Sequence, residues 1–484
     1  MSKRTSMPVL DPVSRASSFK EVASGFTEEQ ALAEANRCLH CKNPLCTGGC
    51  PVKIDIPGFI EQIKLKNYEE AYRIIYRSNR LPSVTGRVCP QETQCEKRCV
   101  LGVKGEPVAI GNLERFVADY HRRSCGNDID GDLRINGENP HSDADASFKE
   151  PSEKDKVAII GSGPCGLTAA GELCAGGYDV TVFEALHKGG GVLSYGIPSF
   201  RLPKNIVDGE IYQLKKQGVK FVFNAPAGCA FTADDLKKWG YKAIIVCCGA
   251  GLPRFMGIKG EDYPFVCSAN EFLTRINLMD AFGDNAATPV FKGGKVIVVG
   301  GGNVAMDAAR SAVRSGAEVT VIYRRSEKEL PARKEEYIHA LEEGVKFEFL
   351  TNPVEIVADE NEQNKKVIVQ KMRLTVPDES GRVAVVPVPG SEYEISADHV
   401  IMAIGTKPNP LVKKILPEII GEKGTVTVDE KARTIVPGVF AGGDAASGAA
   451  TVILAMQAGK IIAESVDEYL GSNRLNEEAN RTRG

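Results

Sequence analysis

The sequence predicts an α/β protein in which two Rossmann-like dinucleotide-binding domains follow an α-helical, cysteine-rich domain. Two segments, 157–184 and 296–325, share one plan of apolar strand, glycine-rich turn, helix and second strand. Such alternation of strands and helices is typical of parallel α/β sheets. Seven of the 14 cysteines lie in the first hundred residues, before this alternation begins. A chain of 484 residues has room for about three domains.

The first part of the chain, residues 1–126, is expected to be a small helical domain. Its segments 27–37 and 56–80 have helical patterns, and Thr27 with Gln30 forms a capping box at the start of the first. The stretch 127–155 is rich in acidic residues, Gly, Asn, Pro and Ser, which indicates a solvated linker.

The first glycine-rich turn predicts a site for an adenine dinucleotide. Gly161, Gly163 and Gly166 follow a strand as G-x-G-x-x-G, which allows a tight turn, contact of backbone with a pyrophosphate and close helix packing. Glu184 ends the second strand about 20 residues later, where a carboxylate accepts hydrogen bonds from ribose hydroxyls. That carboxylate disfavours a 2′-phosphate. The structural alternative is a plain tight turn beside a surface glutamate.

The second glycine-rich turn predicts a site for NADP(H). Gly300 and Gly302 open it, and its second strand ends not in an acid but in Arg324 and Arg325. Arginine binds a 2′-phosphate through charge-assisted, often bidentate hydrogen bonds. A solvated basic strand end is the alternative for this pair. Arg333 is a weaker candidate for the same cluster.

The end of the chain repeats strand, glycine and helix once more. The segment "GVFAGGDAASGAATVILAMQAGKIIAESV", residues 438–466, resembles the second FAD motif of flavoproteins with two dinucleotide domains. By that resemblance Asp444 binds the ribityl–phosphate region, and a helix starting near 449–451 points its positive end at the flavin. "AIGTKPN", residues 403–409, resembles the hinge that returns the chain to the FAD domain.

We therefore expect the NADP domain to be an insertion in the FAD domain. The expected divisions are the helical domain 1–126, the linker 127–155, the first FAD part 156–290, the NADP domain 291–402 and the second FAD part 403–484. The candidate FAD contacts are Gly161, Gly163, Pro164, Gly166, Glu184, Gly191, Leu193, Gly443, Asp444, Ala450 and Thr451. The candidate NADP contacts are Gly300, Gly302, Asn303, Val304, Arg324 and Arg325.

The N-terminal cysteines indicate bound iron and sulfide. "RCLHCKNPLCTGGCP" has the spacing C-x2-C-x4-C-x3-C-P, which resembles a ferredoxin run whose last cysteine serves another cluster. A C-x-x-C-H haem motif is absent, and disulfides are disfavoured in a chain without an export signal. A second group, "RVCPQETQCEKRC", brings the total to seven, so we expect two 4Fe–4S clusters with one ligand missing. A four-thiolate zinc site is the main rival.

The combined motifs are similar to those of one superfamily. "RCLHCKNPLC", "GRVCPQETQCEKRC", "GGGVLSYGIPSFRLPK" and "GGGNVAMDAAR" resemble the small subunit of NADPH glutamate synthase. They resemble still more closely the large, NADPH-binding subunit of NADH-dependent reduced ferredoxin:NADP⁺ oxidoreductase, an electron-bifurcating complex. The flavin and cluster parts are also similar to the N-terminal region of dihydropyrimidine dehydrogenase.

This resemblance implies the ligands of both clusters. Cys38, Cys41, Cys46 and Cys99 would hold the first cluster. Cys50, Cys89, Cys95 and, as the missing ligand, Glu114 would hold the second. For Glu114, pairing with an arginine on the helix surface is the alternative. The stretch 189–204 would cover the flavin.

The expected function is an NADPH-dependent flavoprotein oxidoreductase that moves electrons between NADP(H), FAD and two 4Fe–4S clusters. No acid–base pair or nucleophile is required, so no catalytic side chain is expected. The partners implied are a smaller flavin and 2Fe–2S subunit with ferredoxin, or the large subunit of glutamate synthase, in a hetero-oligomer. Met1-Ser2 does not offer a glutaminase nucleophile. A zinc-stabilised, non-enzymatic NADP-binding protein is a remote alternative.

Charge and hydropathy argue against nucleic-acid-binding and membrane proteins. The net charge is −3 with no basic block, which argues against a nucleic-acid partner or a charged membrane surface. The sequence shows neither a signal peptide nor an apolar run of about 18 residues, so we expect a cytoplasmic protein and no membrane partner.

Overall fold

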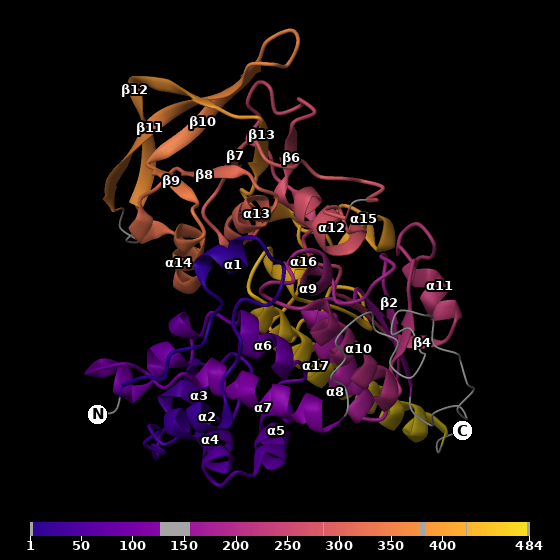
Figure 1. Ribbon diagram of the computed structural model, residues 1–484. Coiled ribbons are helices and arrows are strands. Elements are labelled where there is room, and N and C mark those ends of the chain that lie inside the picture. The colour runs from indigo at the N-terminus through magenta and orange to yellow at the C-terminus, as the bar shows by residue number, and fades with distance from the viewer. Residues whose placement is uncertain (1–2, 126–154, 284, 378–382, 423, 482–484) are drawn as a thin grey trace.

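A computed structural model describes residues 3–125, 155–283, 285–377, 383–422 and 424–481. It contains a helical N-terminal region, two parallel sheets with helices on their faces, and a small antiparallel sheet (Figure 1). Of the expected linker, 127–155, only Asp155 is among the described residues.

The N-terminal region is built from short helices joined by cysteine-bearing loops. Thr27 caps the second helix through the predicted capping box with Gln30. The expected helix 56–80 is two helices instead, because the chain turns at 65–67, where Lys66 has a left-handed φ of 59°. The helices are α1 (Pro12–Ala16), α2 (Glu28–Ala35), α3 (Leu45–Gly49), α4 (Ile56–Lys64), α5 (Tyr68–Tyr76), α6 (Pro82–Val88) and α7 (Ile110–Ser124). Three 3₁₀ turns lie between the last two: η1 (Gln91–Thr93), η2 (Glu96–Arg98) and η3 (Val100–Val103).

The first parallel sheet has the strand order β15-β4-β1-β2-β3. Its strands are β1 (Lys156–Ile160), β2 (Asp179–Phe183), β3 (Lys220–Val222), β4 (Tyr241–Val246) and β15 (Val439–Ala441). The last strand comes from the end of the chain and pairs with β4. The helices of this unit are α8 (Pro164–Ala175), α9 (Val192–Tyr195), α10 (Lys204–Gln217), α11 (Ala233–Lys238), α15 (Val412–Ile415), α16 (Asp444–Ser447) and α17 (Val452–Arg481), and η5 (Pro417–Ile419) adds a 3₁₀ turn.

The second parallel sheet has the order β6-β13-β7-β8-β9. Its strands are β6 (Val266–Ser268), β7 (Lys295–Val299), β8 (Glu318–Tyr323), β9 (Lys346–Phe349) and β13 (His399–Met402). Its helices are α12 (Ala269–Met279), α13 (Asn303–Arg314) and α14 (Lys334–Glu342), with the 3₁₀ turn η4 (Glu327–Glu329) before the last. Because β6 and α12 precede residue 291, this unit begins earlier than the sequence predicted; Phe272 and Leu273 of α12 pack in its core.

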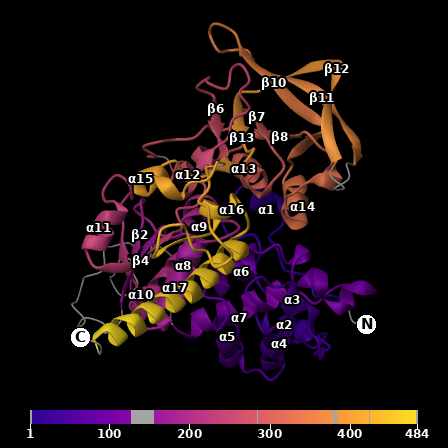
Figure 2. The same cartoon turned by 180° about the vertical axis from the view of Figure 1, so that it is seen from behind.

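Two features of the second unit concern its borders. The chain leaves and re-enters the first unit through a small ribbon, in which β5 (Leu252–Pro253) pairs antiparallel with β14 (Thr406–Lys407). An antiparallel sheet of β10 (Thr351–Ala358), β11 (Lys365–Pro377) and β12 (Val383–Ser396) projects from the far side. Figure 2 shows this sheet at the end opposite the N-terminal helices. The sequence patterns did not predict this antiparallel sheet.

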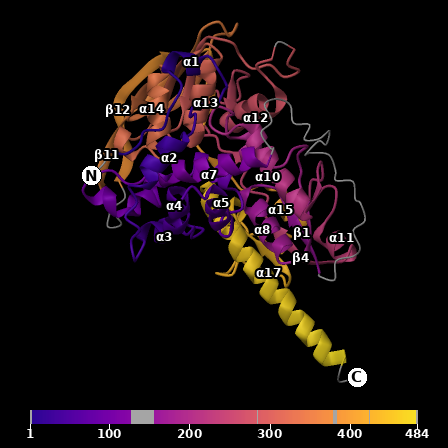
Figure 3. The ribbon, with the colours of Figure 1, turned by 60° about the horizontal axis from the view of Figure 1, so that its bottom comes forward.

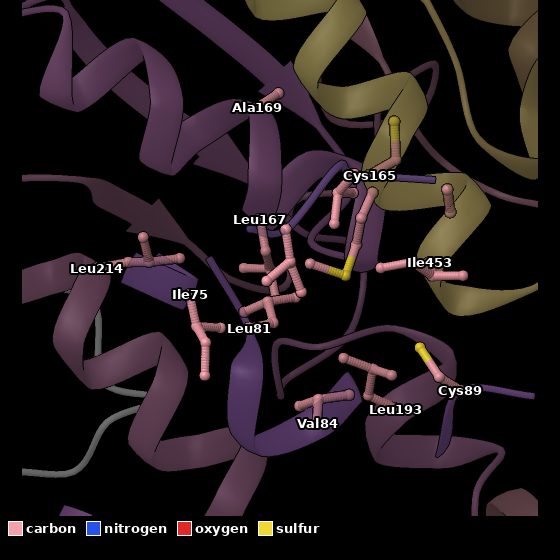
Figure 4. Close-up of a cluster of buried hydrophobic side chains, with 14 of the residues drawn as sticks. Ile75, Leu81, Val84, Cys89, Cys165, Leu167, Ala169, Leu193, Leu214 and Ile453 are labelled. Carbon is pink, nitrogen blue, oxygen red and sulfur yellow. The ribbon is translucent and has the colours of Figure 1, made fainter. Parts of the chain in front are cut away.

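The N-terminal helices pack on the first unit through one continuous core. Ile75, Leu81 and Val84 belong to the same buried cluster as Leu167 of α8 and Leu214 of α10 (Figure 4). The helix α17 packs along α8 and then extends away from the body (Figure 3). In the described ranges, no helix is both long enough and apolar enough to cross a membrane.

Candidate functional site

Four cysteines of the N-terminal region line one apolar cavity. Cys38, Cys41, Cys46 and Cys99 surround a space of about 420 Å³, its open mouth included, together with Ile56 and other apolar side chains. All four are half-buried, and we call them the outer group. Burial, together with the neighbouring Cys99 and Cys38, raises the pKa of the Cys46 thiol to about 11. The cavity therefore gathers Cys99 with cysteines that lie more than fifty residues before it.

Apart from the exposed Cys125, the remaining cysteines of the region are Cys50, Cys89 and Cys95, which are buried and lie near Glu114. We call these three buried cysteines and Glu114 the inner group. Burial raises the pKa of the Cys89 thiol well above its usual value, and the adjacent charges of Glu114, Cys95 and Cys50 raise it further. The same neighbours appear around Cys95, whose pKa is raised by burial, then Glu96, Cys50 and Glu114. The outer cysteines thus share one cavity and the inner ones are neighbours of Glu114, while their roles as the ligands of two clusters stay a prediction.

Glu114 lies on the inner side of α7 with 7% of its surface exposed. Its Oε1 atom accepts hydrogen bonds from Asn79 Nδ2, at 2.9 Å, and from the Thr85 hydroxyl. Burial raises its pKa to about 7, and the two hydrogen bonds oppose that shift. Among the described residues no cation pairs with it, so it is not the helix-surface partner of an arginine. A buried carboxylate without a cation is costly, and a bound metal removes that cost.

The donor sets suit clusters better than single ions. Across the described ranges, no three His, Cys, Asp or Glu side chains are arranged to hold one metal ion. Zinc takes four ligands on a single atom, whereas the ligands of a 4Fe–4S cluster bind four separate irons and stand further apart. Thiolates with one carboxylate are a donor set that an iron–sulfur cluster accepts.

The first glycine turn joins β1 to α8 with backbone that only glycine allows at two points. Gly161 has φ 104°, and a methyl group built on it would lie 2.5 Å from the carbonyl oxygen of Cys247. A methyl group on Gly166 would lie 2.0 Å from the carbonyl oxygen of Gly161. Beside Gly163 there is open space, and no side chain caps the helix that starts at Pro164. The free N–H groups and the space fit a pyrophosphate.

Glu184 follows β2 and lies at the edge of that turn with 6% of its surface exposed. Its carboxylate accepts hydrogen bonds from the backbone N–H of Ser162, at 3.0 Å, and of Leu186, at 2.9 Å. These bonds fix the carboxylate beside the open space, where the ribose of a dinucleotide would lie. Glu184 is therefore buried, which contradicts the alternative of a plain tight turn beside a surface glutamate.

The C-terminal motif contributes further residues to the candidate FAD site. Gly443 has φ 60°, and Asp444 accepts a hydrogen bond from the backbone N–H of Ala450, at 3.2 Å. Burial raises the pKa of Asp444, and the Ala450 N–H opposes this. The helix α17 begins at Val452, one residue beyond the predicted start, and the buried hydroxyl of Thr451 has no hydrogen-bond partner in the described structure. An unpartnered hydroxyl at a helix start fits a bound polar ligand such as a flavin.

The stretch 189–204 forms a compact loop against the N-terminal region. Gly191 has φ 55° and Leu193 is fully buried. Lys204 donates hydrogen bonds to the carbonyl oxygens of Leu193, at 3.2 Å, and Ile197, and burial lowers its pKa to about 7. Cys89 of the inner group belongs to the same buried cluster as Leu193 and Ile453 of α17 (Figure 4). The inner group therefore adjoins the elements of the candidate FAD site.

The second glycine turn repeats the geometry of the first. Gly300 has φ 135°, and a methyl group on it would lie 2.3 Å from the carbonyl oxygen of Ala403, while Gly302 faces open space. The helix α13 starts at Asn303 without a side-chain cap, and Val304 in its first turn is exposed. This turn also fits a pyrophosphate.

The two arginines after β8 differ in their surroundings. Arg324 is exposed, whereas the Nε atom of Arg325 is buried and has no hydrogen-bond partner among the described residues. An unpartnered guanidinium N–H beside a dinucleotide turn fits an anionic group. Arg333 does not join this pair, because its side chain is directed to the N-terminal region instead.

A network of buried ion pairs was not found from the sequence. Arg201 of the stretch 189–204 pairs with Asp307 of α13, at 2.8 Å, and with Glu336 of α14, at 2.9 Å. Arg15 of α1 reaches Glu343, at 3.1 Å, at the end of α14. These pairs tie the N-terminal arm and the first unit to the second. Charged residues at scattered positions carry no spacing that predicts such pairing.

Known proteins share these parts. Residues 15–125 match the family described as dihydropyrimidine dehydrogenase domain II, 4Fe-4S cluster, and residues 155–459 match pyridine nucleotide-disulphide oxidoreductase. The chain is 35% identical to the small chain of NADPH glutamate synthase from Halomonas elongata, over 94% of both chains. It is 43% identical to the beta subunit of the NADP(+)-dependent formate dehydrogenase of Moorella thermoacetica, over 88% of this chain. It spans 60% of that subunit's length.

The fold of the two dinucleotide units also occurs in solved structures. A variant of FprA from Mycobacterium tuberculosis superposes with a TM-score of 0.58 at 19% identity, over 67% of this chain and 86% of FprA. This likeness concerns the fold alone and agrees with the two parallel sheets described above.

Proposed function

Because the chain belongs to the pyridine nucleotide-disulphide oxidoreductase family of flavoenzymes, with a 4Fe–4S domain of the dihydropyrimidine dehydrogenase domain II type before it, we propose that it moves electrons between NADPH and a partner protein through two clusters. It is an iron–sulfur flavoprotein NAD(P)H oxidoreductase, and the relatives reported above are subunits of larger enzymes. The proposal adds the preference for NADPH, the number of clusters and the route.

One observation carries the proposal: the cysteines fall into two groups at different depths. The inner group is buried beside Leu193 and Ile453, whereas the outer group lines a cavity that opens to solvent. Such an order suits a path from a buried flavin to a surface. When bound, FAD accepts two electrons together as a hydride and releases them singly, and each 4Fe–4S cluster carries one.

The protein's own part is to bind and orient. The turn 161–166 and the start of α8 would hold the FAD pyrophosphate, Glu184 its ribose and Thr451 the flavin end. The turn 300–303 would hold the pyrophosphate of NADPH, and Arg325 with Arg324 the 2′-phosphate. The packed core between α6, α8 and Leu193 keeps water away from the inner group. None of these roles needs a side chain that exchanges protons with substrate.

The sequence motifs favour one of two partners. We favour a smaller subunit with flavin and a 2Fe–2S site, together with ferredoxin, in an electron-bifurcating ferredoxin:NADP⁺ transhydrogenase. The alternative is the electron-supplying small subunit of glutamate synthase, which the 94% coverage of both chains favours. A non-enzymatic zinc-stabilised NADP-binding protein is the remote alternative.

The test is anaerobic purification followed by NADPH titration. We expect iron and acid-labile sulfide at about eight atoms each per chain, as two 4Fe–4S clusters require, flavin bands, and bleaching when NADPH is added. Colourless protein with bound zinc would overturn the proposal. Co-purification of the native partner then decides its identity: a small flavin and 2Fe–2S protein supports the transhydrogenase, and a much larger amidotransferase supports glutamate synthase.

A further inference from the structure

Arg333 joins two parts of the protein that are far apart in the sequence. It directly precedes α14 in the second unit, but its guanidinium group lies among residues of the N-terminal region, and its side chain is only 8% exposed. The roles proposed above for the two glycine turns and the two cysteine groups do not include Arg333. We therefore asked what this buried arginine does between the second unit and the N-terminal region.

The backbone at this position is attached to the second glycine turn. The N–H of Arg333 donates a 2.9 Å hydrogen bond to Oδ1 of Asn303, the first residue of α13. The N–H of Ala332 donates to the carbonyl oxygen of Gly301, at 3.2 Å. The backbone of Ala332 and Arg333 is thus hydrogen-bonded to the turn that would bind a dinucleotide. A shift of that turn on binding moves the backbone of Arg333 with it.

The guanidinium group is attached to the loop of the inner group. Arg333 Nη1 donates to the carbonyl oxygen of Arg87, at 3.1 Å, and Nη2 donates to Oε1 of Gln91, at 3.2 Å. These two acceptors lie on either side of Cys89. Gln91 packs in turn against Gly111, where a methyl group would lie 2.2 Å from the amide nitrogen of Gln91. Gly111 is on α7, the helix that carries Glu114.

The charge of Arg333 also reaches the inner group. The guanidinium group is held by acceptors on residues 87 and 91, two positions before and two after Cys89, so its positive charge lies beside that loop. The acids that pair with Arg333 are Glu335, at 2.9 Å, and Glu92, at 3.5 Å, and their side chains are 42% and 36% exposed. Water screens these exposed acids more than it screens the buried guanidinium. Arg333 is therefore expected to add a positive contribution to the potential at the inner group, against the negative charge of Glu114.

We propose that Arg333 is a positioning residue that couples occupation of the NADP site to the reduction potential of the inner cluster. This inference rests on the proposed function, because it requires a cluster on Cys50, Cys89, Cys95 and Glu114. A nearby cation stabilises the reduced cluster, which carries one more negative charge. Movement of the 300–303 turn on dinucleotide binding alters the distance between that cation and the cluster.

The test is a redox titration followed by EPR, on the complete chain with its cofactors. It is performed with and without 2′-phospho-ADP-ribose, a ligand that fills the site but cannot exchange hydride. In wild type we expect the ligand to shift the midpoint potential of one cluster. In Arg333→Gln that potential should be lower without ligand, and the ligand-induced shift should be lost. Arg333→Lys should restore part of the potential because it keeps the charge.

Two further variants separate coupling from general packing. Arg15→Gln removes another buried arginine that spans two units but touches no cysteine loop, so both potentials should stay at their wild-type values. Gln91→Met removes the Nη2 contact from the opposite side and keeps the contact to Arg87, so it should reduce the ligand-induced shift, and it serves if Arg333→Gln does not fold. Unchanged potentials and an unchanged shift in both Arg333→Gln and Gln91→Met would overturn the inference. Wild type without iron and sulfide would instead overturn the proposed function.

Discussion

Asn79 and Glu114 are joined by a 2.9 Å hydrogen bond in the interior of the N-terminal region. Asn79 is fully buried, and its own Oδ1 atom accepts from the N–H of Leu81, at 3.0 Å, so its amide is fixed in orientation. Asn79 and Thr85 both donate to Oε1 of Glu114. In the described structure Oε2 accepts no hydrogen bond, which leaves it available to a metal.

This arrangement predicts the effect of Glu114→Gln. The amide oxygen can still accept from Asn79 and Thr85, but the negative ligand is lost. We expect one of two EPR signals to disappear or change, and iron to fall from about eight to about four atoms per chain. Glu210→Gln is the matched control, because Glu210 is equally buried but lies away from the cysteines. Two unaltered signals in Glu114→Gln would show that Glu114 is not a ligand.

Each proposed cluster takes cysteines from both sequence stretches, and this predicts which cysteine substitutions damage the same cluster. Cys99→Ser should damage the same cluster as Cys38→Ser, because both side chains line the outer cavity. Cys95→Ser should damage the other cluster. EPR spectra of the three reduced variants decide this. If Cys99→Ser instead altered the signal that Cys95→Ser alters, the clusters would follow sequence order rather than the geometry.

Two glycines of the first turn should respond differently to alanine. In Gly163→Ala the new methyl enters open space, so the apoprotein should keep its melting temperature. FAD affinity should fall by about 10-fold or more, since a charged hydrogen bond contributes about 1.5–3 kcal/mol. Gly166→Ala brings a methyl to 2.0 Å from a backbone oxygen and should fail to fold.

Flavin titration and thermal melting of the apoproteins measure both effects. Gly209→Ala is the control, because Gly209 lies within α10 with nothing near the added methyl. It should match wild type in FAD affinity, and its melting temperature should be equal or higher, because alanine has the higher helix propensity. Equal FAD affinity in Gly163→Ala and wild type would place the pyrophosphate elsewhere.

The arginines after β8 predict coenzyme preference. Replacing Arg324 and Arg325 by alanine should raise KM for NADPH by about 10- to 100-fold, as expected from the loss of one or two charge-assisted hydrogen bonds. KM for NADH should stay within about twofold, because NADH has no 2′-phosphate. Steady-state reduction of an artificial electron acceptor measures both. Arg373→Ala, at an exposed position on β11, controls for loss of surface charge; a parallel rise for both coenzymes would contradict the assignment.

Glu210 predicts a pH dependence of stability. It is buried and accepts from the N–H of Ser83 at 3.2 Å, and burial raises its pKa from 4.5 to about 7. The folded state therefore binds its proton more tightly than the unfolded state does, so its contribution falls as pH rises from about 4.5 to about 7 and is fully lost above.

Glu210→Gln keeps the acceptor but removes the titration. Relative to wild type, its apparent melting temperature should be a few degrees higher at pH 8 and equal near pH 4.5. Differential scanning fluorimetry of both proteins across this range measures the difference. The same difference at both pH values would mean that Glu210 does not titrate in this window.

Local patterns predicted local structure well. Both strand–turn–helix–strand repeats appear as β1–α8–β2 and β7–α13–β8, and Thr27 forms its capping box. These features depend on a few adjacent residues whose backbone preferences are strong. The break at Lys66 was missed although the sequence carried a signal for it, because Asn67, a residue favoured at helix N-caps, precedes α5 and its acidic first turn.

Long-range features were beyond such patterns. The position of β6 in the second sheet depends on pairing with β13, which lies more than a hundred residues later. The roles of Arg15, Arg201 and Arg333 likewise depend on which units meet in three dimensions. Isolated charged residues carry no periodicity, so the sequence offered Arg333 only as a weaker candidate for the 2′-phosphate cluster, whereas its side chain contacts the cysteine loop.

The shared use of the two cysteine stretches bears on how the protein is made. Neither set of four side chains is complete until the ribosome has passed Cys99 for one and Glu114 for the other. Iron delivered to the emerging chain would meet only partial sites. With the proposed ligand sets, metal insertion would wait until the whole helical region has been synthesised and has folded, and the two proposed centres would be acquired at nearly the same time.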